Sequence, residues 1–316
     1  MIVYRPISFH EFHGQAAAKR NLEAAVTSAS IRKAAVPHTL LAGPPGLGKT
    51  SLAYVIAAER NVELTVLNAT AIDKPKDLVA PLLQLPENAI LFIDEIHALK
   101  ALCEEFLYTA MEDCRITIPM EDGKEPMSVK LDPFTLIGAT TREGLLTGPM
   151  RDRFQVRERL ELYTDEEMID IIAWTELQFA GHQGVTFDHG LYGTIAACCR
   201  GTARNVQRFL TAMRDEAVVD TGNPTPEVQE HHVVKTLERL GHSVENRFHK
   251  RDIEYLRIIV GEKPVGIKHI AQAMNEDERT IEDTVEPWLV REGYVIRTPQ
   301  GRAISNEGRD VLKQCT

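Results

Sequence analysis

The chain has 316 residues, a formal net charge of -10 and five cysteines, and these values exclude several classes of protein. The length exceeds one average domain, so we expect two or three modules with enough sequence to bury a core. The cysteines show no Cys-x-x-Cys spacing, which argues against zinc and against a secreted disulfide scaffold. No apolar run approaches the roughly 20 residues of a membrane span, and the N-terminus lacks a signal-peptide pattern, so we expect a cytoplasmic protein without membrane contact.

The acidic charge is unevenly distributed along the chain. An acidic chain is disfavoured as a general binder of nucleic acid, because the phosphate backbone favours cations. Residues 245–316, however, contain 12 Lys or Arg and 13 Asp or Glu, so this segment is close to neutral. The acidity therefore lies upstream of the C-terminal segment.

Short apolar runs alternate with helical patterns in the first half of the chain. The runs that predict strands are residues 39–43, 64–68, 89–94 and 134–139, and helical spacing covers residues 50–60 and 98–112. This alternation predicts a parallel sheet covered by helices. Gly43 and Asp94 both fall at the ends of predicted strands, where such sheets bind their ligands.

After Tyr163 the pattern becomes helical. Apolar residues at three- and four-residue spacing predict helices over residues 164–180, 188–199, 203–219 and 226–240. Beyond a linker at Gly241–His249, three short helices precede a pair of strands, at residues 252–259, 267–274, 278–292, 294–297 and 302–305. That order indicates a winged helix. We therefore expect domains at residues 1–163, 164–241 and 242–316.

The segment Gly43-Pro-Pro-Gly-Leu-Gly-Lys-Thr50 matches the eight-residue P-loop and lies between a predicted strand and a predicted helix. Its glycines, Gly43, Gly46 and Gly48, let backbone amides close around phosphates. Lys49 reaches the outer phosphates, and Thr50 offers a hydroxyl to Mg²⁺. The segment therefore predicts that the protein binds ATP with Mg²⁺.

Hydrolysis also requires a carboxylate for the metal and a base for the attacking water, and Asp94 and Glu95 supply both. Asp94 ends an apolar strand and would hold Mg²⁺ through its water shell, while Glu95 would polarise the water. The alternative is that both residues only cap the helix that begins near Ala98. Thr141, which follows the next strand, is expected to orient the water or the γ-phosphate, whereas Thr140 is interpreted as an ordinary turn hydroxyl.

Two arginines are candidates for contacting the phosphates, Arg153 to stabilise charge on the transferred phosphoryl group and Arg204 to report the nucleotide state. Arg153 follows a Gly-Pro turn and is not expected in the same pocket as Lys49, which an arginine acting on a neighbouring subunit would explain. A surface salt bridge with Asp152 is the alternative. Arg204 opens a predicted helix of the second domain, where it either reaches the phosphates or simply faces solvent.

These motifs, in this order, resemble the RuvB family of bacterial Holliday-junction branch-migration motors. The resemblance begins at Tyr4-Arg-Pro-Ile-Ser-Phe and is most specific at residues 41–50, 91–97, 133–142, 264–266 and 297–302. It implies an α/β P-loop AAA+ ATPase domain with a parallel sheet, followed by a small helical lid domain and a C-terminal winged-helix domain. It also implies assembly as a homohexameric ring.

The resemblance assigns roles that the motifs alone do not. It places Tyr4, Arg5 and Tyr163 near the adenosine and Gly46, Lys49, Thr50 and Ser51 on the phosphates. It makes Arg153 the arginine finger and Arg204 the second sensor, and it matches Glu112, Asp113 and Cys114 to a segment beside the nucleotide. From the sequence alone, Glu112 and Asp113 would be a solvated helix end. Departures from the family pattern at Ala98, Ala203 and Gln300 suggest a divergent member, such as one carried on a mobile element.

The leading interpretation is an ATP-dependent DNA translocase that drives branch migration of Holliday junctions in recombination and repair. Arg297 and Arg302 flank a tight turn of the predicted wing, so both could contact phosphates of duplex or four-way junction DNA. A wing that only packs against its own domain is the alternative. Two other functions stay open: a protein-remodelling ATPase, although no aromatic-glycine pore loop occurs between Ala69 and Leu85, and a clamp loader, whose Ser-Arg-Cys motif is absent at residues 151–153.

Residues 115–133 are predicted to form a β-hairpin, because apolar and polar residues alternate on both arms. The apolar residues are Ile116, Ile118, Met120, Met127, Val129 and Leu131, and Glu121–Glu125 provide a glycine-containing turn. An exposed apolar ribbon usually marks an interaction site. By resemblance, the partner is a RuvA-like junction-binding protein. The alternative is that the hairpin folds down onto its own ATPase domain.

Overall fold

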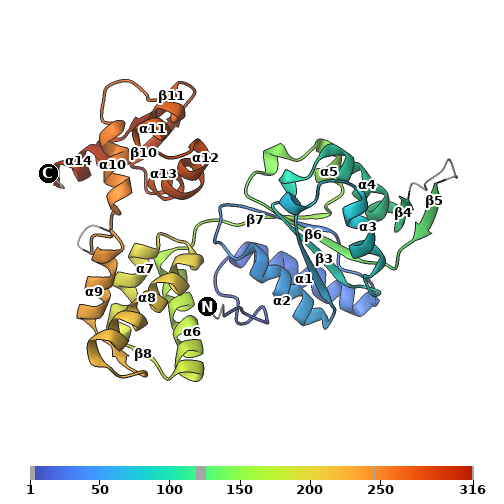
Figure 1. The fold of residues 1–316 in the computed structure, drawn as a ribbon, viewed down its shortest axis with the longest axis horizontal. Helices are drawn as coiled ribbons and strands as arrows, with labels where there is room; N and C mark the ends of the chain where they lie inside the picture. The colour runs from blue at the N-terminus through green and yellow to red at the C-terminus, as the bar shows by residue number, and fades with distance from the viewer. Residues whose placement is uncertain (1–3, 119–125, 245–246, 315–316) are drawn as a thin grey trace. The chain divides into compact units, whose positions relative to one another are not determined.

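The computed structural model describes residues 4–118, 126–244 and 247–314, and the chain divides into two compact units (Figure 1). The first unit runs to Gly43 and resumes at Gly48–Glu161, and the second comprises Pro44–Leu47 and the chain from Leu162 onward. The three-domain boundaries expected from the sequence stay a prediction. Over the described residues, no helix has the length and apolarity to cross a membrane.

A five-stranded parallel sheet forms the centre of the first unit, in the order β2-β3-β6-β1-β7. The strands are β1 (Thr39–Ala42), β2 (Leu64–Asn68), β3 (Ile90–Asp94), β6 (Thr135–Thr140) and β7 (Val156–Arg159). The three inner strands are buried almost throughout, as expected for strands covered on both faces. The predicted parallel sheet is confirmed, whereas β7 was not predicted.

Helices cover both faces of this sheet. They are α1 (Ala16–Arg32), α2 (Lys49–Arg60), α3 (Lys76–Leu83), α4 (Ala101–Asp113) and α5 (Gly148–Asp152). Figure 1 shows α1 and α2 side by side on one face and α3 and α4 on the other, because right-handed crossovers in opposite directions leave the sheet on opposite sides. In the register, Ala42 pairs with Thr140 and Asn68 with Asp94. The carboxyl ends of these strands therefore share one edge of the sheet.

The predicted hairpin is present as β4 (Arg115–Ile118) and β5 (Met127–Lys130), which pair antiparallel. Its turn, Glu121–Glu125, and Met120 lie outside the described residues. Ile116 is fully buried in the core of the first unit, and Ile118 packs against that core. Met127, by contrast, is 47% exposed. The base of the hairpin thus packs on the core of the first unit while Met127 is exposed, so each of the two alternatives describes part of the hairpin, and the docking role stays a prediction.

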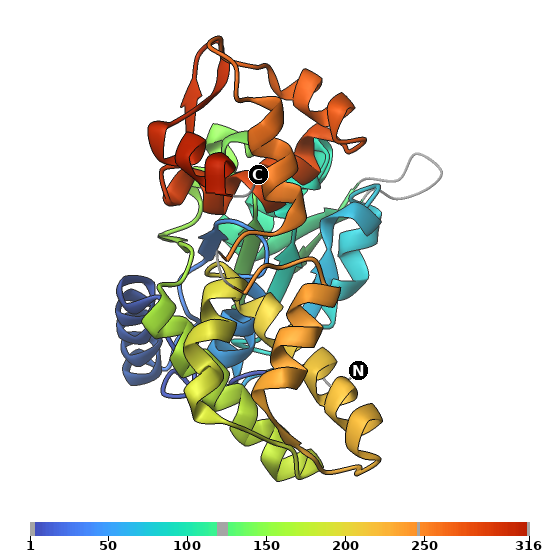
Figure 2. The ribbon, with the colours of Figure 1, turned by 90° about the vertical axis from the view of Figure 1, so that its left-hand side faces the viewer.

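The first half of the second unit is a helical bundle (Figures 1 and 2), which confirms the predicted helical segment after Tyr163. Its helices are α6 (Asp165–Gln183), α7 (Tyr192–Cys199), α8 (Ala203–Thr221) and α9 (Glu230–Arg239), with short paired strands β8 (Thr186–Phe187) and β9 (Glu227–Val228). Helix α6 begins with a capping box between Thr164 and Glu167 and ends at Gly184, which adopts a left-handed conformation. These local signals determine where helix α6 begins and ends.

The C-terminal half of the second unit is a winged helix, as predicted. It contains α10 (Lys250–Ile258), α11 (Ile267–Ala273), α12 (Glu278–Thr280), a π-helical turn (Ile281–Val285), α13 (Glu286–Arg291), the wing strands β10 (Val295–Thr298) and β11 (Gly301–Ile304), and α14 (Asn306–Gln314). Tyr255, Leu256 and Leu289 are fully buried in its core. Only α14 was not expected from the sequence.

The four described cysteines are free thiols, as expected for a chain that does not rely on a disulfide scaffold. Cys103, Cys198 and Cys199 are buried, and burial raises the pKa of each, that of Cys198 to about 11. Cys114, at the end of α4, is partly exposed. Cys315 lies outside the described residues.

Candidate nucleotide-binding and hydrolysis site

The P-loop has the backbone that its glycines predict. Gly43, Gly46 and Gly48 have φ values of 142°, 82° and 94°, a region that side chains other than glycine rarely occupy. A Cβ atom at Gly43 would lie 2.5 Å from the carbonyl oxygen of Leu160. The side chain of Lys49 is buried and donates a hydrogen bond from Nζ to the carbonyl oxygen of Gly43 at 2.7 Å. The two ends of the loop are therefore joined by a hydrogen bond from the side chain of its own lysine.

Helix α2 starts directly after this loop, with Lys49, Thr50 and Ser51 in its first turn. Its N-cap is Gly48, which has no side chain to satisfy the first amides. Those amides and the positive end of the helix dipole favour an anion. Thr50 and Ser51 are partly exposed residues there, and their hydroxyl groups are of the kind that binds phosphate oxygens or a metal.

Asp94 and Glu95 lie at the end of β3, where the chain turns sharply. Glu95 has φ 49° and ψ 44°, a left-handed conformation that is costly for a residue with a Cβ atom. The backbone N–H of Glu95 donates to Oδ1 of Asp94 at 3.0 Å. Thr141 donates to Oε2 of Glu95 from its N–H, at 3.4 Å, and from its hydroxyl, at 3.3 Å. The structure thus brings together three of the residues that the sequence nominated for hydrolysis.

His97 and Thr140 join this cluster, and the sequence interpretation had given neither of them a catalytic part. Nδ1 of His97 lies 3.2 Å from Oε2 of Glu95 and 2.9 Å from the hydroxyl of Thr140. Thr140 is fully buried, and its hydroxyl also accepts the N–H of Arg142 at 2.9 Å. Thr140 is therefore more than a turn hydroxyl, because it fixes the imidazole that holds Glu95. The only sequence signal was the position of His97 two residues after Glu95.

Arg153 packs against α4 of its own chain. Its guanidinium lies over the ring of Tyr108, 4.0 Å from the centroid, and pairs with Glu112 at 3.1 Å. Nη1 also donates to the carbonyl oxygen of Pro149 at 2.8 Å. The salt bridge is therefore with Glu112 and not with Asp152. Since Glu112 contacts Arg153, these two nominated residues share one surface.

The remaining nominated residues at this end of α4 have structural positions of their own. Asp113 is the last residue of the helix and is exposed. Cys114 is the C-cap, in a left-handed conformation with φ 48°.

Near the N-terminus of the chain, Tyr4 is buried. Arg5 is exposed, and its guanidinium lies 4.4 Å from the ring centroid of Tyr54.

The second unit contains the tip of the P-loop together with two nominated residues. The hydroxyl of Tyr163 donates to the carbonyl oxygen of Leu47 at 2.7 Å, and Tyr163 is almost fully buried. The N–H of Arg204 donates to the carbonyl oxygen of Gly46 at 3.2 Å. A Cβ atom at Gly46 would approach Thr202 Cγ2 to 2.6 Å, so only glycine fits. The side chain of Arg204 itself is exposed at the start of α8.

The two wing arginines bind a carboxylate of their own domain. Glu286, which is fully buried, accepts hydrogen bonds from Nε of Arg297 at 2.9 Å and from Nε of Arg302 at 2.8 Å. Arg302 also pairs with Glu282, and its side chain is only 14% exposed, whereas that of Arg297 is 50% exposed. Burial alone would raise the pKa of Glu286, but hydrogen bonds from Arg302 and Tyr255 outweigh it and lower that pKa. Packing within the domain therefore accounts for Arg302 better than for Arg297.

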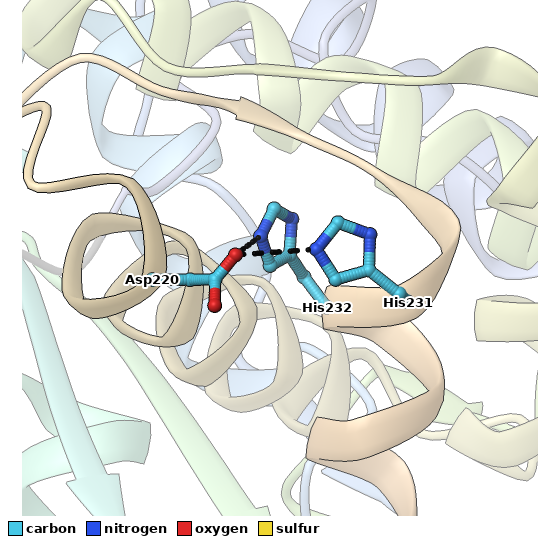
Figure 3. Close-up of side chains that lie close together, drawn as sticks. All are labelled: Asp220, His231 and His232. Carbon is cyan, nitrogen blue, oxygen red and sulfur yellow. Dashed lines mark hydrogen bonds and ion pairs between the residues drawn. The ribbon is translucent and has the colours of Figure 1, made fainter.

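A second polar cluster, Asp220, His231 and His232, lies between α8 and α9 (Figure 3). Oδ2 of Asp220 lies 3.3 Å from Nε2 of each histidine, a ligand spacing that suits a metal ion. However, Nδ1 of the buried His232 accepts the N–H of Gln229 at 3.0 Å, so the proton of the neutral ring sits on Nε2. A metal-bound histidine needs the opposite arrangement, with its second nitrogen donating. The cluster is therefore a helix cap that ties α9 to α8.

The parallel sheet, the P-loop and the Asp94–Glu95 pair define a nucleotide-binding P-loop ATPase of the AAA type. Residues 4–160 match the family model described as the Holliday junction DNA helicase RuvB P-loop domain, and residues 245–313 match the RuvB C-terminal winged helix domain. The chain belongs to the RuvB family, which confirms the resemblance seen in the sequence.

Individual relatives match over nearly the full length of the chain. It is 41% identical over 314 residues to the Holliday junction branch migration complex subunit RuvB of Campylobacter fetus, covering 98% of this chain and 89% of that protein. The protein of the same name from Myxococcus xanthus is 41% identical over 316 residues, covering 98% and 90%. The solved structure of the Thermotoga maritima RuvB Holliday junction branch migration motor has a TM-score of 0.84 at 35% identity and covers 98% of each chain.

Proposed function

We propose that this protein is an ATP-driven DNA translocase that moves the branch point of four-way DNA junctions. The observation that carries the proposal is the union of a RuvB-family P-loop domain and a RuvB-family winged helix in one chain. Relatives 41% identical to it are named subunits of the Holliday junction branch migration complex. Neither a clamp loader nor a protein-remodelling ATPase is favoured by these matches. The proposed place of action is the cytoplasm, where bacterial DNA resides.

The residues at the edge of the sheet fit ATP and Mg²⁺. A loop that has no room for a Cβ atom at Gly43, followed by the start of α2, whose N-cap Gly48 provides no side-chain cap, suits a polyphosphate. The hydroxyl of Thr50 and the carboxylate of Asp94 are hard oxygen ligands of the kind Mg²⁺ prefers. When bound, the metal supplies charge neutralisation on the phosphates. Lys49 would exchange its bond to the carbonyl oxygen of Gly43 for the outer phosphates.

Glu95 is the proposed base for the attacking water. Its carboxylate is already an acceptor for Thr141 and lies beside Nδ1 of His97, so its orientation is set by both. Because Thr141 directly follows the neighbouring strand β6, the same hydroxyl is placed to orient the water or the γ-phosphate. Tyr4, Arg5, Tyr163 and Arg204 are proposed to complete the nucleotide contacts, as in the family.

Assembly and partners extend the proposal. We place Arg153 as the arginine finger of a homohexamer, acting on the nucleotide of a neighbouring subunit together with Glu112, Asp113 and Cys114 on the same surface. Mixing Arg153→Ala with Lys49→Ala protein should then restore turnover at composite sites. Mixed rings that recover no activity would contradict the role in trans.

The hairpin is the proposed docking site for a RuvA-like protein. The domains are proposed to divide at residues 163 and 241.

The decisive experiment measures branch migration directly. A synthetic four-way junction is incubated with the protein, ATP and Mg²⁺, with and without a RuvA-type junction-binding protein, and its conversion to duplex products is followed by native gel electrophoresis. The parent should convert the junction only with ATP, and Glu95→Gln should not. A parent that hydrolyses ATP but leaves the junction intact with the partner present would reject the proposed function.

A further inference from the structure

Helix α13 joins the wing to the chain segment that enters the helical bundle. At its first residue, Glu286 binds Arg297 and Arg302 of the wing. At its last residue, Arg291 donates from Nη1 to the carbonyl oxygen of Tyr163 at 2.7 Å. Both ends of one rigid helical turn are therefore fixed by charged hydrogen bonds, which are stronger than neutral ones.

Tyr163, which Arg291 holds at its carbonyl group, in turn holds the P-loop. Its hydroxyl donates to the carbonyl oxygen of Leu47 at 2.7 Å, and its N–H donates to the carbonyl oxygen of Gly201 at 3.0 Å. Leu47 is fully buried and lies between the two last glycines of the loop. Any shift of Tyr163 therefore changes the backbone that is expected to surround the phosphates.

The packing around α13 leaves little room to absorb such a shift. A Cβ atom at Gly201 would lie 2.6 Å from Nη1 of Arg291 and 2.6 Å from the carbonyl oxygen of Tyr163. Close-packed interiors transmit displacement and do not dissipate it. The junction between α13 and Tyr163 is thus a tight contact with a specific geometry.

The middle of α13 is also fixed against the helical bundle. The guanidinium of Arg200 lies 4.8 Å from the ring centroid of Trp288 and binds both carboxylate oxygens of Asp252. Asp252 is fully buried, and burial lowers the pKa of Arg200 to about 10, still far above neutrality. This ion pair ties α10 and α13 to the end of α7. The winged helix and the bundle are therefore coupled along the whole of α13.

We propose that α13 transmits the position of the wing to the P-loop, and that Arg291 is the positioning residue that sets Leu47 through Tyr163. Engagement of the wing by duplex DNA would shift Glu286 and the helix behind it, and Arg291 would carry that shift to the phosphate cradle. The DNA-dependent part rests on the proposed function, since it takes the wing as the element that contacts DNA. The positioning of Leu47 by Arg291 does not depend on it.

The first experiment tests the positioning without DNA. ATP turnover is measured against ATP concentration for the full-length protein with Arg291→Ala, Arg291→Lys and Arg257→Ala; Arg257 is an exposed arginine of α10 and provides the matched charge control. Loss of one charged hydrogen bond to a carbonyl predicts a KM for ATP raised about threefold or more in Arg291→Ala, with a smaller change in kcat. Lysine should largely restore KM, because its ammonium group can donate to the same oxygen.

The second experiment tests the coupling to DNA. The ratio of duplex-stimulated to basal turnover should fall in Arg291→Ala, and adding Tyr163→Phe should cause little further loss, because both changes break one chain of contacts. An unchanged KM in Arg291→Ala, or an equal rise in Arg257→Ala, overturns the positioning role. A raised KM with full stimulation overturns the transmission. A parent that duplex DNA does not stimulate contradicts the proposed function instead, and the KM comparison still decides the role of Arg291.

Discussion

At the scale of single residues, the hydrolytic centre depends on a glutamate held in an unfavourable backbone conformation. Glu95 keeps its left-handed torsion angles because Asp94, Thr141 and His97 all bind it or its amide. Strain of this kind persists only where surrounding contacts over-determine it, and it clusters at functional sites. The carboxylate is therefore positioned before any substrate arrives.

Replacing Glu95 by glutamine should separate binding from turnover. The amide oxygen can still accept from Thr141, so the fold and nucleotide affinity should be retained, whereas the lost base should reduce kcat by about 10²-fold or more. Fluorescent-nucleotide titration and steady-state hydrolysis measure the two properties. Glu63→Gln, an exposed change in the same unit, serves as the control. Near-parental turnover in Glu95→Gln would show that another group activates the water.

At the scale of elements, the hairpin and the wing each combine a packed base with a more exposed outer part. In the hairpin, Ile116 and Leu131 belong to the core while Met127 is exposed. In the wing, Arg302 is nearly covered while Arg297 is half exposed. Alternation in the sequence predicted the hairpin, and the order of helices and strands predicted the wing. Neither showed which residues face inward, because that depends on the core that each pair of strands meets.

The hairpin can be tested with single substitutions chosen for their exposure. Met127→Glu should leave thermal stability and basal hydrolysis intact and abolish stimulation by a RuvA-type protein. Ile118→Glu should instead lower the melting temperature, because it buries a charge against the core at a cost of several kcal/mol. Ser128→Glu adds the same charge at the adjacent exposed position. If Met127→Glu is stimulated as fully as Ser128→Glu, the docking proposal fails.

The wing arginines should differ in their effects. Arg297→Ala should reduce the magnitude of the log–log salt slope of duplex binding by about 0.9, as expected for one lost phosphate contact. Arg302→Ala should mainly destabilise the winged helix, by about 3 kcal/mol, because it leaves the buried Glu286 incompletely paired. Fluorescence anisotropy at several salt concentrations and urea unfolding measure these effects. An unchanged slope and affinity in Arg297→Ala would leave the wing as a packing element.

At the scale of the whole molecule, acid should weaken the second unit through a buried histidine. Burial lowers the pKa of His242 to about 3, and the nearby guanidinium groups of Arg200 and Arg208 lower it further. In the unfolded chain, the imidazole of His242 takes up a proton below its ordinary pKa of about 6.5, whereas in the folded chain it stays neutral. The free energy of unfolding is therefore highest above pH 6.5 and falls as the pH decreases towards 3. This histidine alone lowers stability by about 1.4 kcal/mol per pH unit at most. Urea unfolding measured between pH 7.5 and 5 should therefore show that the free energy of unfolding depends less on pH in His242→Asn than in the parent. An identical pH dependence in the two proteins would contradict this prediction.

The architecture could be predicted from the sequence better than the contacts between distant residues that position the functional groups. Short apolar runs identified the inner strands, and the P-loop and the Asp94–Glu95 pair identified the edge of the sheet that carries the site. Strand β7 was not predicted because its Arg157, Glu158 and Arg159 look like a solvated loop, although an edge strand tolerates such charges. The contacts of His97 with Thr140 and of Arg291 with Tyr163 join residues 43 and 128 positions apart. No local pattern encodes such pairs, since only the folded backbone brings them together.

The distribution of thiols makes the chain suited to selective chemical labelling. Of the four described cysteines, three are buried with raised pKa values, so their thiolates are scarce and inaccessible to alkylating reagents. Cys114 is the partly exposed one and follows Glu112, the partner of Arg153, by two residues. In a Cys315→Ser background, a maleimide dye should therefore attach at Cys114. Its emission would report ring closure in real time, because the proposed subunit boundary passes beside it.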